Sequence, residues 1–188
     1  MTCIEFFGEN SGKRDIYSSL QELDNAKLFQ WENETASLQS PGPVQNEEIL
    51  IRQIISPHHF DAETKKLKTS AFTDSETFGL SVNRLSHTTV ELIHDVALER
   101  IEKANINAKN PKAFWGTVNF FCAEVRAIFY RSEEGVAPLR GFVIYDTADP
   151  EDPSHADIFT AVPDKAKVRS VRLSLQEIAN NFLEHQPH

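Results

Sequence analysis

The pattern of apolar and polar positions along the chain predicts a β-sheet with a few helices packed against it. Residues 49–55 predict a strand, because β-branched residues fill the run and Pro57 follows it. Shorter runs of strand-forming residues, bounded by turn-forming residues, predict further strands. These strands cover residues 2–7, 69–72, 78–83, 115–121, 140–145, 156–161 and 167–173.

Two segments have the apolar spacing of an amphipathic helix. Thr88-Thr89-Val90-Glu91 is a capping-box pattern, and the apolar residues that follow predict a helix over about 88–105. The same pattern at Ser174 predicts a terminal helix over 174–184, docked on the sheet or, alternatively, presented to a partner. Residues 15–25 predict a third, shorter helix, and residues 26–32 a small strand or loop.

The segment 113–131 fits both a two-residue and a helical period. We favour a strand near 115–121, a short turn or helix over 122–126, and an extended piece ending at Tyr130. The predicted fold class is therefore α+β, a mostly antiparallel sheet packed by two or three helices, with an N-terminal arm.

Pro41-Gly42-Pro43 lies in a segment with almost no large apolar residues, and it marks the clearest boundary in the chain. We predict an N-terminal arm over 1–40, a linker over 41–48 and a single α+β domain over 49–188. A chain of 188 residues is long enough to bury a core without disulfides or structural metals.

The net charge narrows the range of partners. Nineteen basic and 28 acidic residues give a formal charge of −9, which opposes attraction to phosphate backbones and anionic lipids. A nucleic-acid partner would need a local basic patch, and the short lysine clusters are more typical of solvated surface. The two cysteines predict no disulfide framework. Together with the absence of an apolar leader or a long apolar run, they lead us to expect a cytoplasmic protein that is not embedded in a membrane.

An acidic turn supplies candidate metal ligands between two predicted strands. Asp146, Asp149 and Asp157 are oxygen donors of the kind that divalent cations prefer, and strand-end loops can bring such groups together. The spacing matches no calcium loop or zinc helix. The alternative is a turn in which Asp149 and Asp152, each followed by proline, bond local backbone amides.

His155 begins a predicted buried strand, so its imidazole needs a polar partner. Arg52, His58, Ser70 and Ser81 are the polar groups predicted to share the sheet interior with it. If they converge, an arginine, two hydroxyls and two histidines would form an anion or phosphate site.

The order of five short motifs is similar to that in a group of small bacterial proteins of unassigned function. The motifs are Ile51-Arg52-Gln53-Ile54, Ser56-Pro57-His58, Thr69-Ser70-Ala71-Phe72, Leu80-Ser81-Val82 and Asp152-Pro153-Ser154-His155-Ala156-Asp157-Ile158. The resemblance spans about residues 48–160. It implies a bacterial origin, and it singles out Arg52, Ser70, Ser81 and His155 without supplying an activity.

Three functions follow from these patterns. The acidic surface, the arm and the terminal amphipathic helix favour a non-catalytic partner or accessory subunit of an intracellular bacterial complex. The first alternative is an enzyme acting on a nucleotide or nucleic acid, with Arg52 as anion clamp, His58 or His155 as acid/base, and a divalent metal held by Asp146, Asp149 or Asp157. The second alternative is a nucleic-acid binder.

Overall fold

A computed structural model describes residues 1–61, 63–131, 137–181 and 183–185. Its α-helices are α1 (Cys3–Asn10), α2 (Ile16–Leu20), α3 (Asn25–Trp31), α4 (Val90–Asn105), α5 (Cys122–Arg126) and α6 (Lys165–Asn181), and its 3₁₀ helices are η1 (Thr69–Glu76) and η2 (Leu85–His87). Its strands are β1 (Ile49–Ser56), β2 (Phe60–Asp61), β3 (Lys66–Leu67), β4 (Leu80–Arg84), β5 (Ala113–Phe121), β6 (Phe129–Tyr130), β7 (Leu139–Arg140), β8 (Phe142–Tyr145), β9 (His155–Thr160) and β10 (Leu183–His185).

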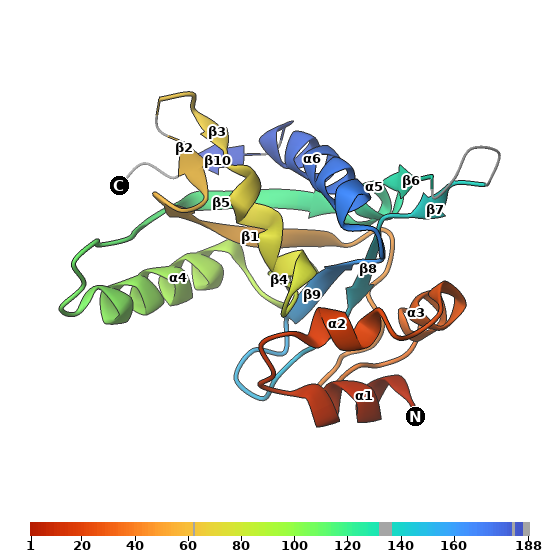
Figure 1. Cartoon of the computed structure of the whole chain (residues 1–188). Coiled ribbons are helices and arrows are strands. Elements are labelled where there is room, and N and C mark those ends of the chain that lie inside the picture. Colours follow the sequence, from red (N-terminus) through yellow and green to blue (C-terminus); the bar gives the residue numbers. More distant parts are fainter. Residues whose placement is uncertain (62, 132–136, 182, 186–188) are drawn as a thin grey trace.

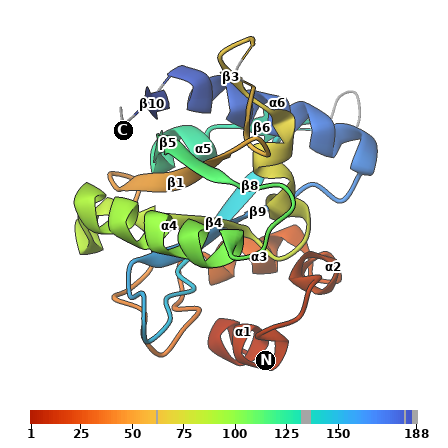
Figure 2. The ribbon, with the colours of Figure 1, turned by 90° about the vertical axis from the view of Figure 1, so that its left-hand side faces the viewer.

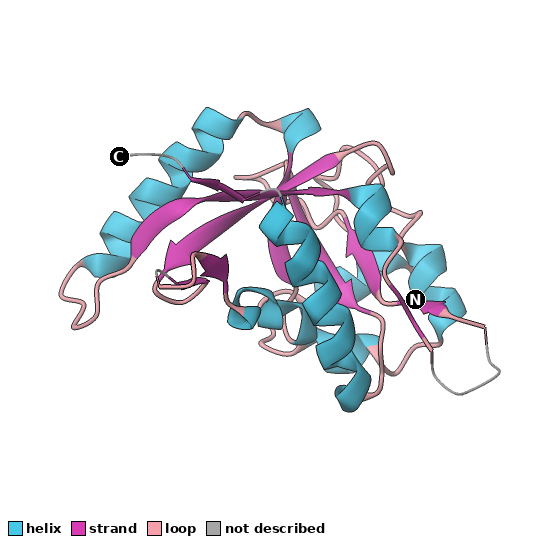
Figure 3. Ribbon diagram, turned by 90° about the horizontal axis from the view of Figure 1, so that it is seen from above, coloured by secondary structure: helices cyan, strands magenta, loops and turns pink. Residues whose placement is uncertain are grey.

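The main sheet is antiparallel throughout. Within the described residues it has six strands in the order β10-β5-β1-β4-β9-β8 (Figure 1). Figure 3 shows the strands in magenta and the helices in cyan, seen from above. β1 pairs with β5 along its whole length, whereas its ladder with β4 covers only Leu50 and Ile51. The predicted α+β class, with a mostly antiparallel sheet packed by helices, is confirmed.

The two faces of the sheet are covered by different elements (Figure 2). On one face, α6 and η1 pack against the largest core cluster, which includes Leu50, Ile54 and Ile158. The opposite face is covered at one end by α4, through Ala97 and Ile101, and at the other end by the arm helices α1–α3. Because side chains alternate along a strand, Ser81, Asn83, His155 and Asp157 point to this second face.

The N-terminal arm is helical where a strand was expected. Residues 3–7 belong to α1, and Thr2 is its N-cap. A capping box fixes the first turn: Thr2 N donates to Glu5 Oε2 (2.7 Å) and Glu5 N donates to Thr2 Oγ1 (3.3 Å). Residues 25–31 are also helical, with Asp24 as N-cap. Side-chain caps thus decide the structure of short segments in which strand-forming residues are common.

The arm packs on the body of the molecule. Phe6, Phe7, Leu28 and Trp31 share one core cluster with side chains of β8 and β9. The hydroxyl of Tyr17 donates to the carbonyl of Val162 (2.7 Å). The division into an arm over 1–40, a linker over 41–48 and a domain over 49–188 stays a prediction.

Two further strand predictions are wrong. Residues 69–72 belong to η1, with Ala71 and Phe72 buried on one side. Residues 167–173 belong to α6, which buries Val168, Val171, Leu175 and Ala179 at helical spacing. The apolar side of the terminal helix packs on the sheet, and Phe182, which the prediction also placed on that helix, lies outside the described residues.

Three of the predicted secondary-structure elements are confirmed. The strand at 49–55 is β1, and the segment 122–126 is α5. The capping pattern at Thr88–Glu91 overlaps the start of α4, whose N-cap is Thr89. In the part of the chain that the structure describes, no helix combines the length and apolarity needed to cross a bilayer.

Candidate functional site

Ser81 and His155 form a hydrogen bond between neighbouring strands. Ser81 Oγ lies 2.9 Å from His155 Nε2. The ladder between β4 and β9 aligns Ser81 with Asp157 and Asn83 with His155, so the bonded pair is diagonal on one face. Ser81 is exposed, and the His155 side chain is 22% exposed, so solvent or a ligand can reach the pair.

Thr147 orients the imidazole from the other side. His155 Nδ1 lies 3.2 Å from the carbonyl oxygen of Thr147 and 3.1 Å from its hydroxyl. A carbonyl can only accept, so this contact places the proton on Nδ1 and leaves the lone pair of Nε2 facing the Ser81 hydroxyl. The network therefore assigns the tautomer in which His155 accepts a proton from Ser81.

A buried carboxyl group lies behind the pair. Asp157 Oδ2 accepts a hydrogen bond from the Thr147 hydroxyl (2.7 Å), and Oδ1 lies 3.8 Å from His155 Nε2. Burial raises the pKa of Asp157, while His155 and the Thr147 hydrogen bond oppose the rise. A side chain at Gly79, whose φ is +103°, would meet the Asp157 carboxyl within 2.8 Å, so only glycine fits beside it.

Arg52 supports Ser81 from the opposite face of the sheet. Its NH1 donates to the Ser81 carbonyl (2.9 Å) and its NH2 to Asp74 Oδ2 (3.0 Å). Its two terminal nitrogens are thus already bound within the protein. Arg52 meets the site through the backbone of Ser81, and its predicted role as an anion clamp stays a prediction.

A pocket of about 500 Å³ adjoins His155 and Asp157. The arm supplies one side through α1, Ile16 and the segment 36–39, and the loop 147–150 supplies the other. Its volume is within the range of small-molecule sites, roughly 300–1,000 Å³.

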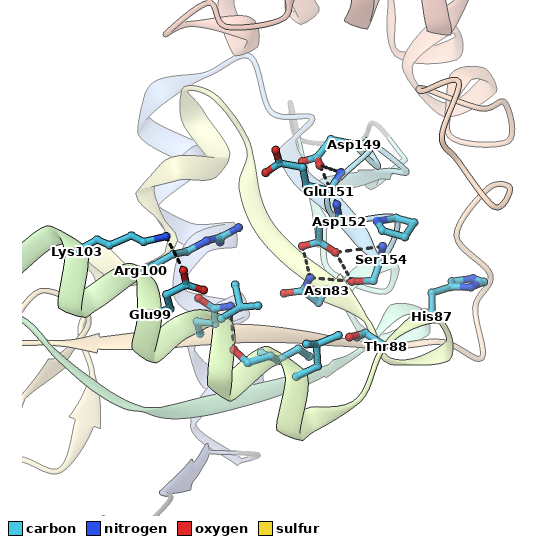
Figure 4. A pocket seen from close by; sticks show the side chains of 15 residues that line it. Asn83, His87, Thr88, Glu99, Arg100, Lys103, Asp149, Glu151, Asp152 and Ser154 are labelled. Atoms are coloured by element: carbon cyan, nitrogen blue, oxygen red, sulfur yellow. Dashed lines mark hydrogen bonds and ion pairs between the residues drawn. The ribbon is translucent and has the colours of Figure 1, made fainter.

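A second groove of about 440 Å³ lies between α4 and the acidic turn. Figure 4 shows Arg100 and Lys103 on the α4 side, Asp149 and Glu151 on the turn, and Asn83 between them. Asn83 Nδ2 donates to Asp152 Oδ2 (2.8 Å) and Ser154 Oγ (2.9 Å), which fixes the turn to β4. Asp149 lines both the groove and the pocket beside His155, so the acidic turn lies between the two.

Two other candidates, His58 and Ser70, bond to each other. Ser70 Oγ donates to the His58 carbonyl (2.7 Å), and both residues are exposed. Ser70 was expected in the sheet interior because 69–72 was predicted to be a strand, and in η1 it points outward instead. Of the predicted polar cluster, the structure thus brings Arg52, Ser81 and His155 together through Ser81.

The predicted metal ligands have separate partners. Asp146 is buried and accepts from Arg84 NH1 (2.7 Å) and from the Ser40 hydroxyl. Asp149 accepts the amides of Glu151 and Asp152, both at 2.8 Å, as the turn alternative describes. Among the residues that the structure describes, no three His, Cys, Asp or Glu side chains gather closely enough to hold a metal ion. Metal binding by Asp146, Asp149 or Asp157 stays a prediction.

Sequence reasoning missed Thr147 and Asp74. Thr147 bonds His155, which lies 8 residues further along the chain, and Asp74 in η1 bonds Arg52, 22 residues away. A lone threonine or aspartate carries no local signal for such a contact. The chain was compared with protein-family models, with curated proteins and with solved structures, and no match was found.

His59, which follows exposed His58, gives a testable pH dependence of stability. Burial lowers its pKa from the ordinary value near 6.5 to about 4, with the positive charge of Arg52 adding to the effect. Its Nδ1 accepts from the Ile55 amide (3.2 Å), a bond that protonation of Nδ1 would remove. The unfolded chain therefore binds the proton more readily than the folded one. The stability that the neutral His59 side chain contributes is complete above pH 6.5 and is lost as the pH falls toward 4.

We expect His59→Gln to reduce the loss of unfolding free energy between pH 6.5 and pH 4 by roughly 1–3 kcal/mol. Urea denaturation across this range measures the change, and His58→Gln is the matched control. Equal pH profiles for wild type and His59→Gln would contradict the assignment.

Proposed function

We propose that the protein is a hydrolase in which Ser81 is the nucleophile and His155 the general base. The observation that carries the proposal is the 2.9 Å contact between Ser81 Oγ and His155 Nε2, with Nδ1 held by Thr147. A nucleophile within hydrogen-bond reach of a base that a third group orients is the recurrent arrangement of covalent catalysis.

The chemistry is acyl transfer to water. Ser81 Oγ attacks the carbonyl carbon of an ester, and its proton moves to His155 Nε2. The bond between the carbonyl carbon and the alcohol oxygen then breaks, and the alcohol leaves with that proton. The oxygen of a water molecule, which loses a proton to the same nitrogen, then bonds the carbonyl carbon of the acylated Ser81. The bond between that carbon and Oγ breaks, Nε2 returns the proton to Oγ, and the acid leaves. The carboxyl group of Asp157 lies 3.8 Å from Nε2, and in its ionised form it stabilises the imidazolium.

A phosphate-containing substrate has less support. The two terminal nitrogens of Arg52 are bound to Ser81 and Asp74, and Asp149 and Asp157 line the pocket beside His155. These features, together with the net charge of −9 of the chain, also disfavour a function in nucleic-acid binding.

Ester hydrolysis by the purified protein tests the proposal. We expect Ser81→Ala to lower kcat/KM for an aryl acetate by at least about a hundredfold, because the nucleophile is lost. Ser70→Ala removes another exposed serine hydroxyl, outside the site, and should hydrolyse at the wild-type rate. Equal rates for Ser81→Ala and Ser70→Ala would reject the assignment.

The accessory-subunit function is a second candidate. Leu92 and Leu98 on α4 are 55% and 42% exposed, and Ile106, which follows the helix, is 71% exposed. Exposed apolar side chains of this kind are available for a protein partner. Native co-purification tests this candidate: a stoichiometric partner lost on Leu92→Ser would support it, and recovery of the chain alone would count against it.

The cytoplasm remains our proposed compartment. Cys3 and Cys122 are both free and buried, as in proteins that fold without disulfides. Burial raises the pKa of each thiol to about 12, so neither is a reactive thiolate at neutral pH.

A further inference from the structure

The pocket beside His155 has an apolar side and a polar side. The arm contributes mostly apolar side chains, together with Ser11, Ser37 and Gln39, and the sheet and the loop after β8 contribute Thr147, His155 and Asp157. The apolar lining residues from the arm are Ile4, Phe7, Ile16, Ala36 and Leu38. A group bound there would contact apolar carbon along most of its length and reach the imidazole at its end.

The lining carries no fixed positive charge. Among the described residues of the pocket there is no lysine or arginine, while Asp149 and Asp157 both contribute carboxyl groups. A phosphate or carboxylate entering it would lose hydration without gaining a cationic partner. The lining therefore selects against anions and favours an uncharged ligand.

The walls of the pocket are tied together. The Ser37 hydroxyl donates to the carbonyl of Ala148, which joins the arm to the opposite loop. The Tyr17 amide donates to the Thr77 carbonyl (2.8 Å), which holds α2 beside the start of β4. Leu38 lies in the wall with 87% of its surface exposed, and a bound apolar group would cover part of that surface.

We propose that this pocket binds the acyl chain of an uncharged carboxylic ester, so that its carbonyl meets Ser81 and His155. The inference rests on the proposed hydrolase function and adds the substrate class. Chain length is then selected by the arm, because the arm supplies the apolar lining.

Gly8 offers a direct test. It lines the pocket on α1, and a Cβ at this position would meet no atom within 4 Å. Gly8→Phe therefore adds an aromatic ring to the pocket side of the helix without a backbone clash. Glu9→Phe places the same ring on the next residue, which is exposed and outside the lining, and serves as the matched control.

We expect Gly8→Phe to lower the ratio of kcat/KM for p-nitrophenyl hexanoate to that for p-nitrophenyl acetate by about tenfold relative to Glu9→Phe. The shorter ester needs less of the pocket, so the ratio isolates binding of the chain. An equal ratio in the two variants would overturn the inference, even if hydrolysis depends on Ser81.

Binding to an inactive protein separates this inference from the proposed function. In Ser81→Ala, calorimetry with methyl hexanoate should detect binding, and adding Gly8→Phe should weaken it about tenfold. No binding, or binding that Gly8→Phe leaves intact, would overturn the pocket assignment. If the ester binds in this way but the wild type does not hydrolyse it, the proposed function fails and the preference of the pocket stands.

Discussion

Replacing His155 with alanine is expected to lower ester hydrolysis by about 10²–10⁴-fold, the usual contribution of a general base. His155 Nε2 is the acceptor 2.9 Å from Ser81 Oγ, and no second imidazole contacts that hydroxyl in the part of the chain that the structure describes. The loss should fall on kcat, because the proton transfer occurs in the transition state. Steady-state kinetics with an aryl acetate measure both constants.

His58→Ala is the control for this experiment. His58 is an exposed histidine whose carbonyl bonds Ser70, and the sequence offered it as an alternative acid/base. It should retain the wild-type kcat. A loss with His58→Ala equal to that with His155→Ala would contradict the assignment of the base, and a rise in KM alone for His155→Ala would reduce His155 to a binding role.

Replacing Arg84 with methionine is expected to destabilise the fold by about 3–5 kcal/mol, the cost of leaving a buried charge without its partner. The Arg84 side chain is 3% exposed, and it bonds Glu48 Oε1 and Asp146 Oδ2, both at 2.7 Å. Asp146 is itself fully buried. Arg84 NH1 also donates to the Gly42 carbonyl (2.7 Å), so the substitution frees the linker from β4.

Thermal unfolding should show a fall in Tm of roughly 10 °C for Arg84→Met. Arg172→Met removes a comparable ion pair with Glu76, but those side chains are 17% and 29% exposed, and its cost should be near 1 kcal/mol. Equal Tm values for the two variants would contradict the expectation that the burial of Asp146 sets the cost of losing Arg84.

The elements that could be predicted carry strong local signals. β1 is a run of β-branched residues, and α4 follows a Thr89 cap with apolar residues on one side. α6 was missed over residues 165–173 because Val168 and Val171 were assigned to a two-residue period, although their spacing of three is helical. α1 was missed because the prediction for residues 2–7 rested on strand-forming residues alone, whereas Thr2 and Glu5 form a capping box.

The site was predictable only in part. A histidine at the head of a buried strand needs a polar partner, and that argument gave Ser81 among four candidates. The choice among them depends on the register of β4 against β9, which joins residues 74 positions apart. Ser70 was excluded only when η1 replaced the expected strand. The apolar pocket could not be foreseen, because it forms between the arm and a loop more than a hundred residues away in sequence.

Covalent labelling of Ser81 tests the central claim most directly. An uncharged alkyl fluorophosphonate reacts with an activated serine, whose oxygen bonds phosphorus as fluoride leaves. Peptide mass spectrometry of the labelled protein should find the adduct on Ser81, at a rate that falls by at least about a hundredfold in His155→Ala. Labelling that is absent from Ser81, or that proceeds equally fast without His155, would contradict a nucleophile activated by this histidine.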